Sequence, residues 1–157
     1  MIAPIFVDTN VLVCAVDGSA GDRHALAREW MRTLWDQETG RISVQVRQEF
    51  YVTVTRKLRP GMSPADAQRE VSALLPWAPI EINPDILERA WFIESRYGLS
   101  WWYALIVGSA QTLGCRTLLT EELQHGQMFD NLTVINPFRT TPSELSSTPM
   151  PIPSTPS

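Results

Sequence analysis

Several features that mark familiar classes of protein are scarce in this sequence. It has two cysteines, Cys14 and Cys115, which lack the spacing of a zinc site, so we expect reduced thiols. Neither of its two histidines lies beside a serine or cysteine in a nucleophile motif. A glycine-rich phosphate loop with its lysine is also missing. These shortages argue against triad hydrolysis and against P-loop nucleotide binding.

Positive charge and long apolar runs are scarce as well. The chain has 13 Lys and Arg against 17 Asp and Glu, a net charge of -4, so any nucleic-acid binding would need a local basic patch. No apolar run approaches the roughly 20 residues of a membrane span. The N-terminal run continues straight into Asp8 and does not form a signal peptide. We therefore expect a soluble, cytoplasmic protein without a membrane partner.

The composition that remains is that of a globular domain followed by a different tail. Of the 157 residues, 44% are hydrophobic, and six are tryptophans, which is enough for one domain with a sizeable core. From residue 140 to residue 157 the chain turns to Pro, Ser and Thr, with Glu144 as the single charge. The sequence predicts a domain over 1–139 and a disordered tail over 140–157.

Hydrophobic patterning predicts an alternation of short strands and helices. Helix starts are marked by Ser63-Pro64, Asn83-Pro84 and Ser100, and Gly98 marks a helix end. This pattern indicates a three-layer α/β/α fold, with a short, mostly parallel central sheet flanked by helices. We expect strands at 5–7, 42–44, 80–82, 117–119 and 133–135, and helices beginning near residues 22, 46, 64, 84 and 101.

Three consecutive aromatic residues, Trp101, Trp102 and Tyr103, lie near the start of the last of these helices. Side chains of neighbouring helical residues point about 100° apart, so the three cannot all enter one core face. Apolar residues follow both tryptophans at helical spacing, and we predict that both pack in the core. Tyr103 is then the ring that faces elsewhere.

Acidic residues with apolar neighbours are the candidate functional residues. Asp8 follows the first strand, Glu49 lies near the start of a helix, and Glu121 and Glu122 follow the strand at 117–119. The carboxyl ends of parallel strands share one edge of a sheet, so these acids can converge there. The alternative is that Asp8 is a turn or cap residue and that Glu121 and Glu122 open a solvated helix.

Converged carboxylates require a positive counter-charge. Two unit charges at 4 Å repel by roughly 4 kcal/mol at an effective dielectric of 20. No basic residue lies within the Asp8 or Glu121-Glu122 motifs. A divalent cation, Mg²⁺ or Mn²⁺, therefore suits a site of Asp8, Glu49 and Glu122, and one of its waters could attack a phosphodiester.

The densest basic cluster is the candidate RNA contact. Arg47, Arg56, Lys57 and Arg59 lie on or just after one predicted helix, and such a cluster can neutralise a few phosphates. The alternative is a solvated helix end, where basic residues complement the helix dipole.

Taken in order, these pieces resemble the PIN domain family, and more narrowly its VapC-type toxin ribonucleases. Several weak motifs in series carry the resemblance, which runs from about residue 5 to residue 138. They are Asp8-Thr-Asn-Val-Leu-Val, Gln48-Glu49-Phe50, Gly98-Leu-Ser-Trp-Trp-Tyr-Ala-Leu-Ile-Val, Leu119-Thr-Glu-Glu-Leu-Gln-His-Gly126 and Asn131-Leu-Thr-Val-Ile-Asn-Pro137.

The resemblance implies a metal-dependent endoribonuclease that acts on structured RNA, often transfer RNA, and is the toxin of a toxin–antitoxin pair. Such proteins are usually homodimers held inactive by a cognate antitoxin. Asp8 matches the first family acid, Glu49 matches the second, and Glu122 falls where the family usually has Asp. Adjoining residues expected to line the site are Thr9, Asn10, Tyr103, Thr120 and Glu121.

One family acid is missing from this chain. Tyr103 stands where the family usually carries Asp, and a phenol is neutral at pH 7 and bulky. One hypothesis is a nuclease with a weakened metal site, because Mg²⁺ often needs only one or two carboxylates plus water. The other is a catalytically degenerate PIN domain, a module that binds RNA or an antitoxin without cutting.

A third hypothesis comes from Asp8 alone. Phosphotransferases of the haloacid-dehalogenase type carry a nucleophilic Asp after an N-terminal strand and a second Asp two residues later, where this chain has Asn10. Those enzymes also need a basic residue at the phosphate, and the one lysine here is Lys57. Trapping of an aspartyl phosphate on Asp8 would distinguish this hypothesis from a nuclease.

Overall fold

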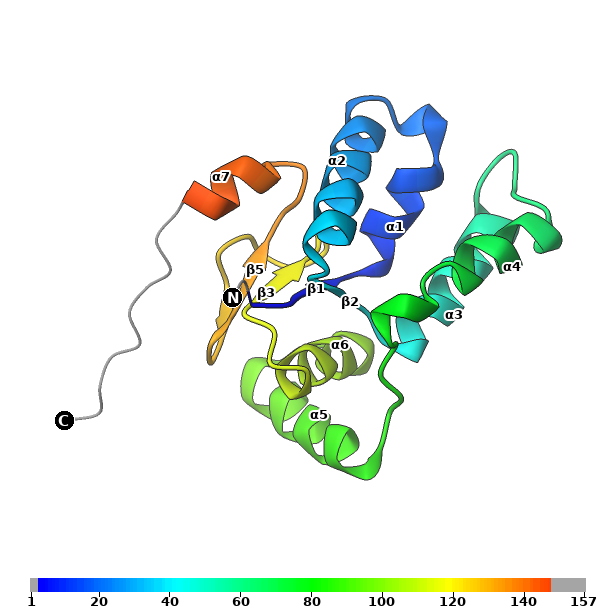
Figure 1. Ribbon diagram of the computed structural model, residues 1–157. Helices are drawn as coiled ribbons and strands as arrows, with labels where there is room; N and C mark the ends of the chain where they lie inside the picture. Colours follow the sequence, from blue (N-terminus) through cyan, green and yellow to red (C-terminus); the bar gives the residue numbers. More distant parts are fainter. Residues whose placement is uncertain (1–2, 148–157) are drawn as a thin grey trace.

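The computed structural model describes residues 3–147, which form a central five-stranded sheet with helices on both faces (Figure 1). The strand order is β2-β1-β3-β5-β4, and all neighbours are parallel except the pair β4 and β5. Helices α1 and α2 cover one face, and α5 and α6 cover the other. The predicted three-layer α/β/α fold is confirmed. The strands are β1 (Ile5–Val7), β2 (Gly40–Arg41), β3 (Thr117–Leu119), β4 (Met128–Phe129) and β5 (Leu132–Ile135).

The helices account for most of the described chain, and their starts follow the predicted caps. Ser63 Oγ accepts a hydrogen bond from the Asp66 N–H, and Asn83 Oδ1 accepts one from the Ile86 N–H, so both caps satisfy a free donor of the first turn. The α-helices are α1 (Thr9–Val16), α2 (Asp22–Gln37), α3 (Val44–Val52), α4 (Pro64–Ser72), α5 (Pro84–Tyr97), α6 (Trp101–Thr112) and α7 (Pro142–Ser147). Short turns are η1 (Gly18–Ala20), the π-helical η2 (Thr53–Lys57) and η3 (Leu75–Trp77).

Close packing of α5 on α6 is permitted by small residues. A Cβ on Gly108 would lie 3.7 Å from the Ile86 carbonyl oxygen, so at this point the α6 surface lies against the α5 backbone. Ala90 and Ala104 are fully buried. Between the two helices Gly98 has φ 66°, a left-handed conformation that glycine adopts without strain, as predicted for this helix end.

Two predicted strands are wrong. At 42–44, Ser43 caps α3 and Val44 already belongs to it, and the strand is instead Gly40–Arg41. Ile80 forms only an isolated parallel bridge with Ser43, so 80–82 is not a strand of the sheet. These segments are apolar because they lie beside the sheet edge, where Ile42 is fully buried, although neither is a strand of the sheet.

The predicted disordered tail is wrong for residues 140–147. Residues 142–147 form α7, and Leu145 packs against the core. The buried Trp30 on α2 donates its indole N–H to the Pro137 carbonyl at 2.9 Å and to the Thr140 carbonyl at 3.1 Å. These bonds hold the segment after β5 against α2. The rest of the predicted tail, 148–157, lies outside the described residues.

Two further properties bear on the predictions from composition. Both cysteines are buried free thiols. Among the helices of residues 3–147, none combines the length and the apolar character needed to cross a membrane.

Candidate functional site

Asp8 lies where β1 ends and α1 begins, and its backbone fixes it at the sheet edge. Its N–H donates to the Leu119 carbonyl at 3.0 Å, which continues the β1–β3 pairing by one residue. Its Oδ1 caps α1 by accepting from the Thr9 N–H at 2.7 Å. Its Oδ2 accepts from Asn10 Nδ2 at 3.0 Å and from the Thr120 hydroxyl at 2.8 Å. The carboxylate of Asp8 is therefore held rigidly by residues of both strand ends.

Burial makes ionisation of Asp8 unfavourable. The side chain is 3% exposed, and burial, partly offset by the hydrogen bonds from Thr120 and Thr9, raises its pKa from 3.8 to about 6. The charges of Glu49 and Glu122 raise the pKa further. Asp8 and these two acids are thus electrostatically coupled, as expected for carboxylates facing one space.

Glu49 approaches Asp8 from α3 and is positioned by both of its oxygens. Thr9 Oγ1 donates to Oε2 at 2.9 Å, and Gln45 Nε2 donates to Oε1 at 3.1 Å. The same Gln45 amide lies 3.3 Å from the Trp102 carbonyl oxygen, so it links α3 to the start of α6. Gln45 is not among the predicted site residues, although its position one helical turn before Glu49 favours this contact.

The two glutamates after β3 have different partners. Thr120 is fully buried, and its hydroxyl oxygen accepts from the Glu122 N–H at 3.1 Å, which fixes the backbone of this loop. Glu121 forms an ion pair with Arg23 of α2. Glu122 is exposed at the cleft. Arg23, which also packs over the Phe138 ring, was missed because it looked like part of a solvated helix face.

Tyr103 lies in the first turn of α6 and enters the same space as the acids. Its N–H donates to the capping Ser100 Oγ at 3.4 Å. Burial raises the pKa of the phenol, and the charges of Asp8, Glu122 and Glu49 raise it further. The phenol therefore stays protonated and neutral among three carboxylates, and its ring, which was predicted to face away from the core, also packs against it.

These groups line one cleft of about 520 Å³ between α1, α3, η2, the start of α6 and the loop after β3. Of the four predicted RNA contacts, Lys57 is the one that lines it. Arg47 instead donates to the Val71 carbonyl at 3.3 Å, and Arg56 and Arg59 are exposed outside the lining. The cleft lining consists of Asp8, Thr9, Asn10, Val13, Cys14, Glu49, Thr53, Lys57, Ser100, Trp102, Tyr103, Ile106, Glu121 and Glu122.

The prediction that Trp102 packs in the core is wrong. Trp101 is partly buried against the core, but the Trp102 side chain is 62% exposed at the cleft. Trp102 lies on the same side of α6 as Ile106, but no described element covers that side of the first turn, so the ring stays exposed.

The donor set fits a hard divalent cation held by few protein ligands. Asp8, Glu49 and Glu122 offer only oxygen, which Mg²⁺ and Mn²⁺ prefer. Within residues 3–147, however, no three side chains of the His, Cys, Asp and Glu types lie close enough together to hold one ion. The residues therefore fit an ion bound by one or two carboxylates with several waters, and not a three-carboxylate site.

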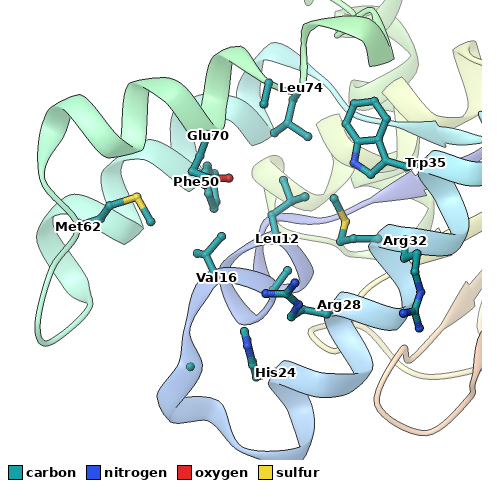
Figure 2. Close-up of a pocket in the computed structure, with 14 residues that line it drawn as sticks. Leu12, Val16, His24, Arg28, Arg32, Trp35, Phe50, Met62, Glu70 and Leu74 are labelled. Carbon is teal, nitrogen blue, oxygen red and sulfur yellow. The ribbon is translucent and has the colours of Figure 1, made fainter.

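A second hollow, of about 740 Å³, lies between the α1–α2 pair and the α3–α4 pair (Figure 2). Its apolar lining includes Leu12, Val16 and Phe50. Arg28 and Arg32 of α2 add positive charge on one side. The groove therefore combines an apolar floor with a basic flank.

Comparisons with known proteins agree on the fold. The PIN domain family model matches residues 5–127. The chain is 23% identical to a protein of a toxin–antitoxin complex from Klebsiella pneumoniae, with a TM-score of 0.62 over 86% of this chain and 98% of that one. No curated protein matches the chain significantly.

Two further solved structures share this fold. VapC20 of Mycobacterium tuberculosis, a toxin that cleaves the sarcin–ricin loop, is 19% identical, with a TM-score of 0.55 over 73% of this chain and 86% of that one. The VapBC2 complex of Rickettsia felis, solved with a DNA fragment from its promoter, contains a chain that is 16% identical, with a TM-score of 0.60 over 83% and 96%.

Proposed function

Because this chain belongs to the PIN domain family, we propose that it is a ribonuclease of the VapC type that hydrolyses RNA phosphodiester bonds in the acidic cleft. The observation that carries the proposal is the convergence of Asp8, Glu49 and Glu122 from three separate segments into one cleft. Burying the Asp8 carboxylate close to the charges of Glu49 and Glu122 is unfavourable for folding, and a catalytic cation gives a reason for it.

The residues of the cleft have different proposed roles. Asp8 and Glu49 supply carboxylate oxygens whose positions are fixed by Thr9, Asn10 and Gln45. A bound Mg²⁺ or Mn²⁺ supplies Lewis acidity at the scissile phosphate and a more acidic water. Lys57 brings a positive charge to a cleft whose other charged residues are acidic.

The test compares RNA cleavage by the native protein and by Asp8→Ala in Mg²⁺ and in Mn²⁺. We expect Asp8→Ala to abolish cleavage, while Asp36→Ala, which removes an exposed carboxylate of α2, leaves it unchanged. If the native protein cuts no faster than Asp8→Ala, the hydrolytic function is wrong.

Tyr103 favours a second candidate function, a degenerate PIN domain that binds RNA or an antitoxin without turnover. Its neutral ring stands among the acids, and no three ligand-type side chains of residues 3–147 converge on one ion. The Tyr103→Asp variant separates the two candidates. If the chain is a weakened nuclease, the native protein cuts RNA and Tyr103→Asp binds Mn²⁺ more tightly than the native protein does. If it is a degenerate domain, Tyr103→Asp cuts RNA and the native protein does not.

We also propose that an antitoxin helix occupies the groove of Figure 2. The apolar floor suits the apolar face of an amphipathic helix, and Arg28 and Arg32 suit acidic residues at its edge. If an antitoxin copurifies with the native chain, its removal should restore RNA cleavage. The Arg28→Glu, Arg32→Glu double variant should lose the antitoxin, and Arg69→Glu, a reversal at an exposed arginine of α4, should retain it. Retention by the double variant would place the antitoxin elsewhere.

The family resemblance further implies a homodimer, and we propose that state for this chain. Light scattering of the purified protein tests it directly.

A further inference from the structure

The ion pair between Arg23 and Glu121 lies at the edge of the cleft and has no part in the chemistry proposed above. It joins α2 to the loop after β3, and its two residues are 98 positions apart in the chain. By contrast, the pair of Arg69 with Asp66 lies within one helix, and both of its side chains are more than half exposed. The Glu121 side chain is only 23% exposed, so its charge is withdrawn further from water.

Contacts other than the ion pair also hold Arg23 in place. Its guanidinium lies over the Phe138 ring, 4.6 Å from the ring centre, and its Nη2 atom lies 4.0 Å from Cys14 Sγ. Side chains from α1, α2, the loop after β3 and the segment after β5 therefore meet at this one guanidinium. A guanidinium fixed in this way loses less side-chain entropy on pairing than an isolated surface arginine does.

Glu121 is the fourth carboxylate of the cleft, next in the chain to Glu122. Its backbone is tied to the Asp8 side of the cleft, because its N–H donates to Asn10 Oδ1 at 3.4 Å. Within residues 3–147, no basic side chain forms an ion pair with Asp8, Glu49 or Glu122. Glu121 therefore differs from the other three acids in having its charge already neutralised.

We propose that Arg23 is a positioning residue, which binds the Glu121 carboxylate and so keeps it from the cation of the cleft. The inference rests on the proposed function for the presence of a cation and adds which acids are free to hold it. An additional carboxylate ligand binds a hard divalent ion more tightly and takes the place of one of its waters. With Arg23 in place, the cation is left to the other three acids and retains more of its waters.

Mn²⁺ binding, measured without RNA at physiological ionic strength, tests this inference separately from hydrolysis. We expect Arg23→Met, whose side chain can still pack on Phe138, to raise the Mn²⁺ affinity roughly 10-fold, because the released carboxylate attracts the divalent ion at short range. The loss of a positive charge outside the cleft lining should by itself have little effect, because the Debye length is about 8 Å under these conditions.

A double-mutant cycle assigns this gain to Glu121. Glu121→Gln should bind Mn²⁺ much as the native protein does, and the Arg23→Met, Glu121→Gln double variant should lose the gain. Arg69→Met, which breaks the exposed ion pair of α4, is the matched control and should leave the Mn²⁺ affinity unchanged.

The relaxation of water protons by bound Mn²⁺ is a second measurement, because it increases with the number of waters on the ion. For each bound ion it should fall in Arg23→Met and return to the native value in the double variant with Glu121→Gln. A structural role of Arg23 alone would produce neither change. Thermal melting of each variant verifies that the fold is retained.

Three results would overturn the inference. The first is that Arg23→Met binds Mn²⁺ no more tightly than the native protein, and the second is that its gain persists in the double variant with Glu121→Gln. The third is that Glu121→Gln weakens Mn²⁺ binding as strongly as Glu122→Gln does, which would make Glu121 a ligand in the native protein. A Glu121-dependent gain in Mn²⁺ affinity without any RNA cleavage by the native protein would support the inference and refute hydrolysis instead.

Discussion

Replacement of Asp8 by Asn should stabilise the protein, because the folded state confines a charge that water would solvate better. A rise in pKa from 3.8 to about 6 corresponds to about 3 kcal/mol of unfavourable free energy for the ionised carboxylate at neutral pH. The amide introduced by Asp8→Asn still accepts from the Thr9 N–H, and the Thr120 hydroxyl can reverse its role and accept from the new amide in place of Asn10 Nδ2. The bond from Asn10 Nδ2 is lost, at a cost of about 1 kcal/mol.

The net gain is therefore about 2 kcal/mol at neutral pH, which for a chain of this length corresponds to a Tm increase of roughly 4–8 °C. The gain depends on pH with a definite sign. The pKa of Asp8 is higher in the folded than in the unfolded chain, so the folded state holds the proton more tightly. The stabilisation from protonated Asp8 is complete below about pH 3.8 and is lost as the pH rises through about 6.

The assay is urea unfolding of native protein and Asp8→Asn at a series of pH values, in chelator so that no metal binds. The difference in unfolding free energy should be close to zero near pH 4 and should grow to about 2 kcal/mol near pH 7. Asp36→Asn, at an exposed position, serves as the control and should show no such growth. A flat difference across this range, or a less stable Asp8→Asn at neutral pH, would refute the account of Asp8 as a desolvated charge.

Three further predictions concern packing and metal binding. Gly40→Ala should lower stability by about 1–3 kcal/mol in urea unfolding, because its Cβ would lie 2.4 Å from the buried Trp77 ring; Gly18→Ala, with open space around it, is the control. Trp30→Phe removes the two bonds from the indole to the segment after β5, so hydrogen exchange over 140–147 should accelerate, and unchanged protection there would contradict this role. Mn²⁺ should raise the Tm of the native protein and not that of Asp8→Asn, and equal shifts in both would place the ion elsewhere.

Much of the fold follows from local sequence signals. The caps at Ser63, Asn83 and Ser100 and the glycine at position 98 act within one helical turn, so their effect is encoded in residues that are neighbours in the chain. By contrast, the sequence did not distinguish a strand from a buried loop at 42–44 and 80–82. A short apolar run is compatible with both, and only pairing with distant residues decides between them.

The candidate site also combines features set by local sequence signals with features set by tertiary contacts. The sequence by itself placed Asp8 and Glu122 after two strands of a mostly parallel sheet, because short apolar runs are local signals. Helical periodicity predicted that one of three aromatic rings leaves the core, but it selected Tyr103, whose ring lines the cleft and also packs against the core. Only the tertiary structure paired Glu121 with Arg23, tied Glu49 to α6 through Gln45, and left Trp102 open at the cleft. Each of these depends on which distant segment approaches a side chain, and spacing along the chain does not encode that approach.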